Sequence, residues 1–544
     1  MGFLGILEPK SGEHVPGTVV LDDQAAHSEG TTSNLKHASG KSGNIILIPQ
    51  PSNDPNDPLN WSQTKKLTCM LIVGFGSCVY GATIPPLLNA GTVVIAMDLG
   101  VSIPAVIQAS GYQVLVVAGS ATIVNAISRK FGKRPVFLAS CIFGLVGSAV
   151  GSASQNYSQL LTARIIQGFS CTAYESLLLA IVGDLFFLHE RGTYSAFANF
   201  ILGAVSNFSS VICGPITTNL GWRWLFHLLL ILGSLIMVLH FLFVPETQYN
   251  RDRAYELDET GIPAATLNEK VDAVQVEDVG SNSGSNSSIK PKTYVQSLAI
   301  FTGKYSNENF FMLCFGPFAT CLNLAVLWVI ILSGYYLSLF VTVAYLLAQL
   351  FSPPPYLLTA SGVGYLSLGP FLGGLLAAVV SAFINDPLVR WCAKRNKGVY
   401  EPEYRLLIAH GGLIGIAGFI GFGFAAQNYE SYFLTAFCHG MGLFGLMFLF
   451  ISSTNYALDS FREMSNEIFL ASMAFKNLII FAYAYFINDW AAREGPAQVL
   501  YVLGAVGAGL MITTPVLFIF GKRYRLWWHK HNLVQKLGIV THAE

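Results

Sequence analysis

The chain has 544 residues, of which 53% are hydrophobic and 11% are charged, and its mean hydropathy is +0.51. Soluble domains carry about 25% charged residues, so this composition excludes a soluble enzyme or binding module and predicts an integral membrane protein. The formal net charge is zero, so charge gives no indication of a nucleic-acid or acidic partner.

Apolar windows of about 20 residues, enough to cross a hydrocarbon core of about 30 Å, recur along the whole chain. They predict an all-α membrane protein with twelve transmembrane helices in two pseudo-symmetric six-helix bundles. The stretch 336–351 is also apolar and is expected to extend the seventh helix. The predicted spans are 67–90, 104–127, 135–154, 159–183, 195–218, 224–244, 311–335, 360–384, 406–426, 432–456, 467–488 and 497–520.

Lysine and arginine predict the orientation, because cytoplasmic loops collect them. With these spans, all but four of the 31 lysine and arginine residues fall in segments on one side. Arg223 and Arg493 lie in loops on the other side, and Arg164 and Lys476 lie within spans. Both termini are therefore expected in the cytosol.

Composition divides the chain into five segments. The beginning is polar and lacks the apolar run of a signal peptide, and the serine- and asparagine-rich stretch 281–288 reads as linker. We predict a disordered cytosolic tail (1–60), a first six-helix bundle (61–247), a cytosolic linker (248–309), a second six-helix bundle (310–525) and a cytosolic tail (526–544).

The fourth predicted span carries two charged residues, Arg164 and Glu175. An ionisable residue inside a span costs several kcal/mol unless a partner or water receives it, so it indicates a functional site. A separation of eleven residues returns both to one helical face, roughly 16 Å apart along the axis. This face is expected to look into a polar interior.

Other polar residues at depth are Lys476 and Asn477 in the eleventh predicted span and Asn323 in the seventh. Lys476 is expected to bind an anionic group or to pair with Glu175; extending its side chain to a lipid headgroup is the alternative. Aromatic residues spread over several spans, among them Tyr174 and Trp328, suit amphipathic organic molecules. We take Glu175, Tyr174, Asn323, Trp328, Lys476 and Asn477 as candidate substrate-binding residues.

Two motifs are candidates for gating. A short basic loop follows the second span, in which Gly132 permits a tight turn and the cations can bind helix C-termini or acidic side chains; ordinary inside anchoring is the alternative. In the fifth span, Gly214-Pro215 bends the helix and lets a neighbour approach closely. The basic residues of the loop are Arg129, Lys130, Lys133 and Arg134.

Several motifs together resemble a fungal member of the major facilitator superfamily, in its twelve-span drug:proton antiporter-like branch. The resemblance covers about residues 54–525. The matching segments are NDPLNWSQTKK before span one, KFGKRP after span two, ARIIQG and DLFFLHERGT in and after span four, GPITTNLGWRWLF in span five, VPET after span six, RNKGVYEPEYRL before span nine and NYALDS after span ten.

The resemblance implies alternating-access transport of amphipathic small organic molecules, such as a drug, toxin or secondary metabolite, in exchange for protons. Arg164 holds the place of the family's proton-coupling arginine, and Glu175 is the acid on its face; a structural strut is the alternative for both. The basic loop has Arg129 where the family carries an acid, so Asp184 is the candidate replacement. Proton-driven uptake of polyamines or other organic cations and a non-transporting nutrient receptor are the rival functions.

The remaining expectations follow from the same features. We expect no enzymatic activity, no cofactor and no metal, and a monomer in the lipid bilayer whose partners are protons and a small-molecule substrate. The expected location is the plasma membrane, with the vacuolar membrane as the alternative. Asn156 begins a glycosylation sequon in an outer loop close to the membrane.

Overall fold

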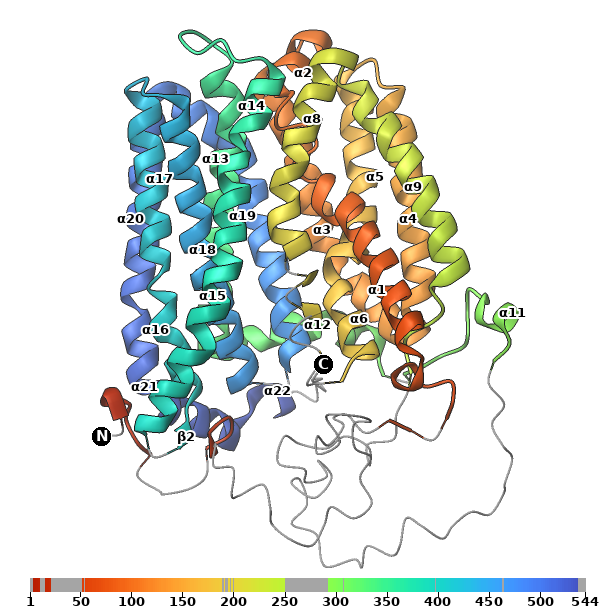
Figure 1. Ribbon diagram of the computed structural model, residues 1–544, viewed down its shortest axis with the longest axis vertical. Coiled ribbons are helices and arrows are strands. Elements are labelled where there is room, and N and C mark those ends of the chain that lie inside the picture. The colour runs from red at the N-terminus through yellow and green to blue at the C-terminus, as the bar shows by residue number, and fades with distance from the viewer. Residues whose placement is uncertain are drawn as a thin grey trace, which may run out of the picture.

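The computed structural model describes residues 3–9, 15–20, 51–52, 54–187, 190, 194–195, 197–198, 200–249, 292–306, 308–396, 398–461 and 464–536. Long helices run side by side along the molecule, as Figure 1 shows. Within the described residues, eleven helices are long and apolar enough to cross a membrane. The only strands in these residues are the two-residue β1 (Val19–Val20) and β2 (Val399–Tyr400), so the predicted all-α membrane fold is confirmed.

The first half of the chain contains a set of long helices joined by short turns. Its first span continues from α1 into the π-helical segment η5, and its fourth span is divided after Ser176. The elements are η1 (Phe3–Gly5), η4 (Pro58–Asn60), α1 (Gln63–Gly76), η5 (Ser77–Thr83), α2 (Thr92–Leu99), α3 (Ile103–Phe131), α4 (Lys133–Ser152), α5 (Tyr157–Ser176), α6 (Leu178–Leu185), η6 (Ile201–Val205), α8 (Ser206–Leu220) and α9 (Arg223–Phe243).

The second half follows a stretch of short elements. Its elements are α11 (Tyr294–Ser297), α12 (Phe310–Ala319), η8 (Thr320–Leu322), α13 (Leu324–Phe351), α14 (Ala360–Leu366), α15 (Leu368–Arg395), η9 (Pro402–Arg405), α16 (Leu406–Ala409), α17 (Gly412–Gln427), α18 (Tyr432–Ser460), α19 (Ser465–Glu494), α20 (Pro496–Ile512), α21 (Thr514–His531) and α22 (Leu533–Lys536).

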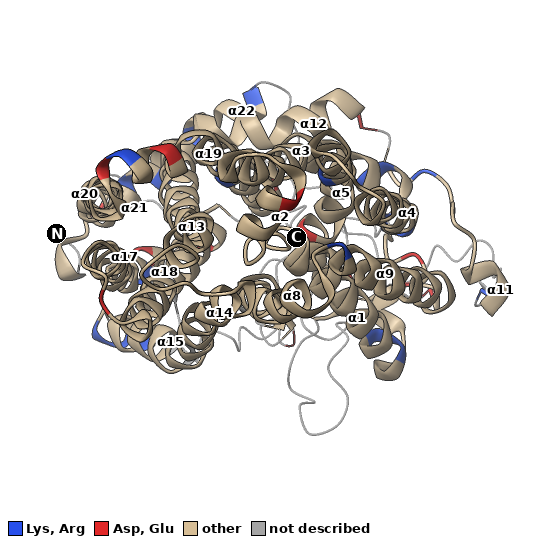
Figure 2. Ribbon diagram, turned by 90° about the horizontal axis from the view of Figure 1, so that it is seen from above, with Lys and Arg blue, Asp and Glu red and all other residues tan. Residues whose placement is uncertain are grey.

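The two halves lie side by side. Seen from above, the long helices of the first half gather on one side and those of the second half on the other, with α3 beside α19 and α8 beside α14 at the boundary (Figure 2). The short helices α11 and α12 lie on the side of the first half (Figure 2). We call the end that carries η1, β2 and α22 the inner end, and the opposite end the outer end (Figure 1). The inner end is the one that the distribution of lysine and arginine assigns to the cytosol.

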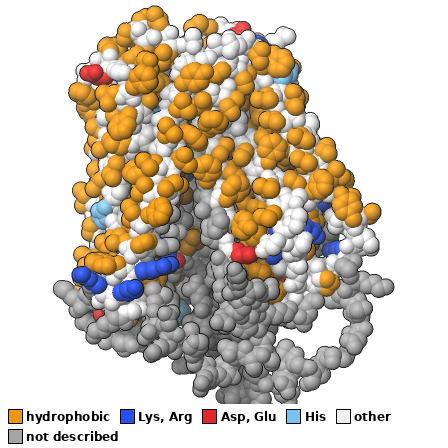
Figure 3. Space-filling view, viewed as in Figure 1, with side chains coloured by type: hydrophobic (Ala, Val, Ile, Leu, Met, Phe, Trp, Pro, Cys, Tyr) orange, Lys and Arg blue, Asp and Glu red, His pale blue; other side chains and the backbone are white. Residues whose placement is uncertain are grey.

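The sides of the molecule present an apolar surface. Large hydrophobic side chains are exposed on helices of both halves, for example Ile231, Leu235 and Val238 on α9 and Phe383 on α15. Figure 3 shows apolar side chains over most of the visible side and cationic side chains gathered toward the inner end. A surface of this kind is stable only against lipid, which fits a multi-pass membrane protein.

The eleven membrane-spanning helices coincide with eleven of the twelve predicted spans, and one of these, the seventh, is displaced. The remaining predicted span, 195–218, falls on η6 and α8, whose described residues are helical from Ile201 to Leu220. Hydropathy located the spans because a helix needs about 20 apolar residues to cross the bilayer.

The seventh span differs from the prediction. It runs from Leu324 to Phe351, so the predicted extension over 336–351 is confirmed, but it begins later than the predicted residue 311. Residues 310–322 form the separate short helix α12 and the turn η8. Asn323 marks the break: its backbone is extended, and its side-chain oxygen accepts hydrogen bonds from the amides of Ala325 (3.1 Å) and Val326 (3.3 Å). Hydropathy cannot detect this break because the chain is apolar on both sides of it.

Parts of both predicted tails are folded in the structure. Residues 3–9 and 15–20, expected to be disordered, lie against the inner end of the second half. Residues 54–60 fold before the first span, where the Asp57 carboxylate accepts a hydrogen bond from the amide of Leu59 (3.0 Å). At the other end, helix continues beyond residue 525, to His531 in α21 and to Lys536 in α22.

Substitution of Asn323 tests whether its side chain stabilises the start of α13. Asn323→Ala removes the oxygen that caps α13, so it is expected to lower the free energy of unfolding by about 1 kcal/mol. Asn323→Asp and Asn323→Ser keep an acceptor oxygen and are expected to stay close to wild type. Thermal unfolding in detergent measures the three variants, and equal melting temperatures for Ala, Asp and Ser would contradict the capping role.

Candidate functional site

An ion pair joins the two halves. Glu175 is the penultimate residue of α5 in the first half, and Lys476 lies in α19 of the second half. The Lys476 Nζ and Glu175 Oε1 atoms are 2.6 Å apart, and the side chains are 21% and 16% exposed. The pair is thus enclosed by helices but still accessible to water or a solute.

The predicted substrate-binding residues do not all meet at this pair. Asn477 follows Lys476 in α19 and is 3% exposed, and its amide nitrogen has no hydrogen-bond partner within the described residues. Tyr174, next to Glu175, points instead into the core of the first half, where its hydroxyl lies 3.1 Å from Cys141 Sγ and its ring stacks on Tyr80. The structure therefore brings together Glu175 and Lys476, and Asn477 is buried next to Lys476 in the sequence.

Two further predicted residues have structural contacts elsewhere. Trp328 donates its indole N–H to the Thr513 hydroxyl (2.7 Å), which joins α13 to the junction of α20 and α21. Asn323 caps α13 and lies at the end of the span, not at depth. Hydropathy placed Asn323 too deep because it put the start of the seventh span too early.

Arg164 is fully buried, and its hydrogen-bond partners among the described residues are all neutral groups. Its guanidinium donates to the carbonyl oxygens of Ile84 (2.9 Å) and Pro85 (3.2 Å) and to the side chains of Gln113 (2.7 Å) and Gln167 (3.0 Å). The two carbonyls belong to the irregular segment that follows η5. Arg164 therefore joins α5, α3 and the end of the first span, and it does not contact Glu175.

At the outer end the halves touch through backbone. A Cβ atom on Gly214 of α8 would lie 2.5 Å from the carbonyl oxygen of Ala360, and a Cβ on Gly364 of α14 would lie 2.6 Å from that of Ser210. Only glycine fits such a crossing. Pro215 follows inside α8, which continues through it to Leu220. Gly214 was predicted from the sequence as a point of close helix approach, whereas its counterpart Gly364 was not.

Side chains reinforce the contact between the halves at the outer end. The Thr218 hydroxyl lies 2.9 Å from the Ser361 hydroxyl and accepts a hydrogen bond from the Ser361 amide (3.0 Å). Between α3 and α19, the hydroxyl of Tyr485 donates to that of Tyr112. These contacts close the outer end.

At the inner end, the basic loop meets an acid that sequence analysis did not select. Gly132 has φ 99°, and a Cβ atom there would lie 2.1 Å from Glu246 Oε2. The Glu246 carboxylate accepts hydrogen bonds from the amides of Lys133 (2.8 Å) and Arg134 (3.1 Å), the first residues of α4. A carboxylate at a helix N-terminus is favoured by the helix dipole. The signal was available: Glu246 is the acid of the quoted VPET segment.

The four basic residues of the loop contact both halves of the protein. Lys133 pairs with Asp184 (Nζ–Oδ2 2.8 Å) within the first half. The Arg134 guanidinium donates to the carbonyl oxygen of Phe241 in α9 (2.7 Å) and to that of Leu298 after α11 (3.1 Å). The NH1 group of Arg129 lies 3.8 Å from Glu467 Oε1 of α19, in the second half. Lys130 donates to the carbonyl oxygen of residue 308 (3.2 Å) in the segment before the second half.

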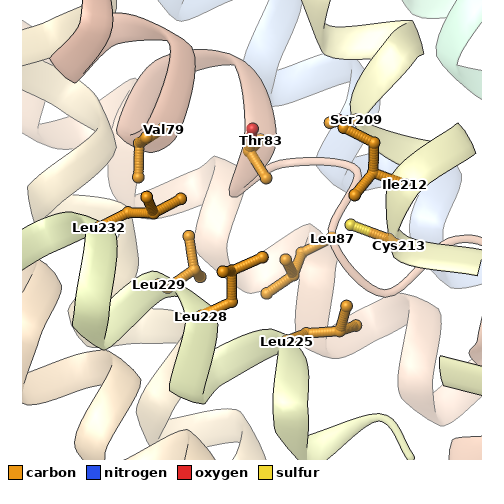
Figure 4. Close-up of a pocket in the computed structure, with 10 residues that line it drawn as sticks. All are labelled: Val79, Thr83, Leu87, Ser209, Ile212, Cys213, Leu225, Leu228, Leu229 and Leu232. Atoms are coloured by element: carbon orange, nitrogen blue, oxygen red, sulfur yellow. The ribbon is translucent and has the colours of Figure 1, made fainter. Parts of the chain in front are cut away.

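A small cavity lies away from the ion pair. It encloses about 100 Å³ between η5, α8 and α9 of the first half, and Figure 4 shows its almost entirely apolar lining. Drug-sized ligands occupy cavities of roughly 300–1,000 Å³, so this one is too small for an organic cargo. None of the candidate substrate-binding residues lines it. Its lining residues are Val79, Thr83, Leu87, Ser209, Ile212, Cys213, Leu225, Leu228, Leu229 and Leu232.

The predicted glycosylation site, Asn156, is exposed and precedes α5 at the outer end. Its side-chain oxygen accepts a hydrogen bond from the amide of Gln159 (3.0 Å). Glycosylation there stays a prediction.

Comparison with known proteins identifies the fold family. A sequence model described as Major Facilitator Superfamily matches residues 67–484. The chain belongs to this superfamily. Its members are membrane transporters of small-molecule substrates rather than enzymes, as predicted.

Individual relatives are distant but match over most of their length. An uncharacterized MFS-type transporter of Schizosaccharomyces pombe is 25% identical over 95% of this chain and 94% of its own. An MFS-type efflux pump of Trichophyton rubrum is 23% identical over 82% and 71%. A structure of the xylose transporter XylE of E. coli in a partially occluded inward open conformation superposes with a TM-score of 0.55, at 13% identity, over 83% of this chain and 97% of that one.

Glu246 gives a pH-dependent prediction. Burial raises the pKa of Glu246 above its ordinary value of 4.5, against the amide hydrogen bonds that lower it. The native state therefore binds a proton at a pH where the unfolded chain does not, so wild type should gain stability relative to Glu246→Gln as pH falls through the raised pKa toward 4.5.

The measurement is the difference in melting temperature between wild type and Glu246→Gln at pH of about 7.5 and about 5. Glu246→Ala is the matched control. It leaves the α4 amides unpaired at both pH values and is expected to cost about 1–2 kcal/mol. If the difference in melting temperature between wild type and Glu246→Gln is the same at both pH values, the pKa of Glu246 is not raised.

Proposed function

We propose that this protein is a proton-coupled transporter that exports amphipathic small organic molecules by alternating access, with the plasma membrane as its location. The observation that carries the proposal is the ion pair between Glu175 and Lys476, because it joins the halves that must move relative to one another. The efflux pump among the relatives supports the direction of transport.

A physical mechanism follows from the position of the pair. The Glu175 carboxylate can be neutralised by the Lys476 ammonium, by a proton or by a cationic group of the cargo, and each excludes the others. Protonation or cargo binding would release Lys476 and remove an attraction between the halves. Competition for one carboxylate is the elementary requirement for exchanging cargo against protons.

The proton gradient supplies enough free energy. One proton that crosses about 100 mV and about one pH unit releases roughly 3.7 kcal/mol. This sustains a concentration gradient of about 500-fold for a neutral cargo. No nucleotide hydrolysis is needed.

The other candidate residues take supporting roles in this proposal. Arg164 would act indirectly by holding α3, α5 and the end of the first span together, since its partners are neutral oxygens. Asn477 would offer its unpaired amide to the cargo beside Lys476. The basic loop and the crossing at Gly214 would be the inner and outer gates, which part alternately.

The paired state of Glu175 disfavours the uptake of polyamines. A polycation requires several uncompensated acids, whereas the Glu175 carboxylate is already matched by the Lys476 ammonium. A cargo with at most one positive charge fits this site better.

Transport in proteoliposomes tests the proposal. Glu175→Gln is expected to reduce the pH-gradient-driven flux of an amphipathic cation more than tenfold, because no proton can be exchanged, while its melting temperature stays near that of wild type. Glu494→Gln, an exposed acid at the end of α19, is the matched control and should transport normally. Unchanged proton dependence in Glu175→Gln would contradict the proposal.

A double variant that exchanges the two charged side chains distinguishes a role in proton coupling from a purely structural role. The double variant Glu175→Lys with Lys476→Glu keeps an ion pair between α5 and α19, so it should recover stability but not wild-type coupling. Wild-type coupling in this double variant would mean that the pair only holds the helices together.

A further inference from the structure

The beginning of the chain is docked on the second half. Ile6 is 2% exposed and packs in a cluster with Val389, Cys392 and Tyr404. The backbone amide of Leu7 donates to the carbonyl oxygen of Ile519 in α21 (3.0 Å). One apolar side chain and one backbone hydrogen bond thus fix residues 6 and 7.

A second contact is strand addition. β1 pairs antiparallel with β2, with Val19 opposite Tyr400 and Val20 opposite Val399. β2 follows α15 in the segment that leads to the ninth span. Pairing of an extended peptide with an exposed strand is a common mode of peptide recognition.

A third contact is a buried cluster of charges. Arg525 is 1% exposed and its NH2 group lies 2.8 Å from both Glu401 Oε2 and Glu403 Oε2. Lys522 contacts Glu401 Oε1 at 2.6 Å. These two cations and two acids balance in charge, and all belong to the second half.

The N-terminal segment completes this cluster. The NH1 group of Arg525 donates to the carbonyl oxygen of Pro16, and the Thr18 hydroxyl donates to Glu401 Oε2 (2.8 Å). Glu8 Oε2 lies 2.7 Å from Lys522 Nζ. The segment therefore accepts a hydrogen bond from the buried Arg525 and adds an acid to Lys522.

Every partner of residues 3–9 and 15–20 found among the described residues belongs to the second half. Residues 52–60, by contrast, bind the first half: the Tyr249 hydroxyl after α9 donates to Asp54 Oδ2 (3.1 Å), and Lys66 of α1 donates to the carbonyl of Leu59 (3.0 Å). The chain thus starts on one half and continues into the other.

We propose that residues 3–9 and 15–20 form a releasable clasp, an intramolecular peptide ligand for a binding site on the inner end of the second half. The site consists of the β2 edge, the pocket around Ile6 and the cation pair Lys522 and Arg525. It recognises an extended peptide with an apolar residue followed by an acid. When bound, the clasp holds the inner ends of α15, α18 and α21 together as one body.

The clasp is releasable because its interface is small. It consists of one two-residue strand pair, two buried apolar side chains (Ile6 and Val15) and an acid, Glu8, whose side chain is 50% exposed. Single hydrogen bonds at Leu7, Glu8, Pro16 and Thr18 complete it. Covalent attachment supplies an effective concentration in the millimolar range, which keeps a weak interaction occupied. An added negative charge at Thr18 would face Glu401 and oppose docking.

Binding in trans tests the site directly. A labelled peptide of residues 3–20 is titrated into the chain lacking residues 1–20 in nanodiscs, and fluorescence anisotropy is recorded. Saturable binding is expected, at least tenfold tighter than to the full chain, whose site is occupied. The peptide variants Ile6→Asp and Glu8→Lys should each bind at least tenfold more weakly. Equal binding by all peptides, or none by the wild-type peptide, would overturn the proposal.

The full chain provides a test that does not depend on the folding of the truncated one. Thr18→Glu is expected to open the site, so that the labelled peptide binds and the melting temperature falls. Thr64→Glu adds the same charge to an exposed residue of α1 in the first half and should behave like wild type. Identical behaviour of the two variants would exclude a clasp controlled at Thr18.

Discussion

Charged groups among helices that lipid surrounds must find their partners inside the protein. This constraint is met in two different ways on one helix. Arg164 uses carbonyl oxygens that the irregular end of the first span leaves free, together with two glutamine side chains. Glu175 depends on Lys476 of the opposite half. The first solution is internal to one half, whereas the second makes the electrostatic balance of the site depend on how the halves are placed.

The inner ends of the two halves are built alike. In each, a cation at the start of the third or ninth span pairs with an acid at the end of the fourth or tenth: Lys133 with Asp184 (2.8 Å), and Arg405 with Asp459 (2.5 Å). In each half, a charged residue that follows the sixth span of that half contacts the loop between its second and third spans. In the first half this residue is the acid Glu246, and in the second it is the cation Arg525. The inverted sign means that the second half presents cations to Glu8 of the N-terminal segment at this position, where the first half presents an acid.

Sequence alone predicted what depends on composition and periodicity. The spans and the all-α fold follow from hydropathy, and the charges of Glu175 and Lys476 stand out because so few charges lie at depth. Asn323 was misplaced because a capping residue breaks a helix without changing hydropathy. Tyr174 was selected as an aromatic residue at depth, but neighbouring positions on a helix point about 100° apart, which turns it into the core. Glu246 and Gly364 were missed because their importance depends on partners that only the folded chain brings close.

The central claim is that Glu175 changes its partner during transport. Infrared difference spectroscopy on the reconstituted protein, with Glu175→Gln as the reference, measures this directly through the C=O stretch of a protonated carboxyl group. We expect a signal of protonated Glu175 at low pH that disappears when a cationic cargo is added and is missing from Glu175→Gln. A signal that does not respond to cargo, or a Glu175 that stays ionised under all conditions, would contradict it.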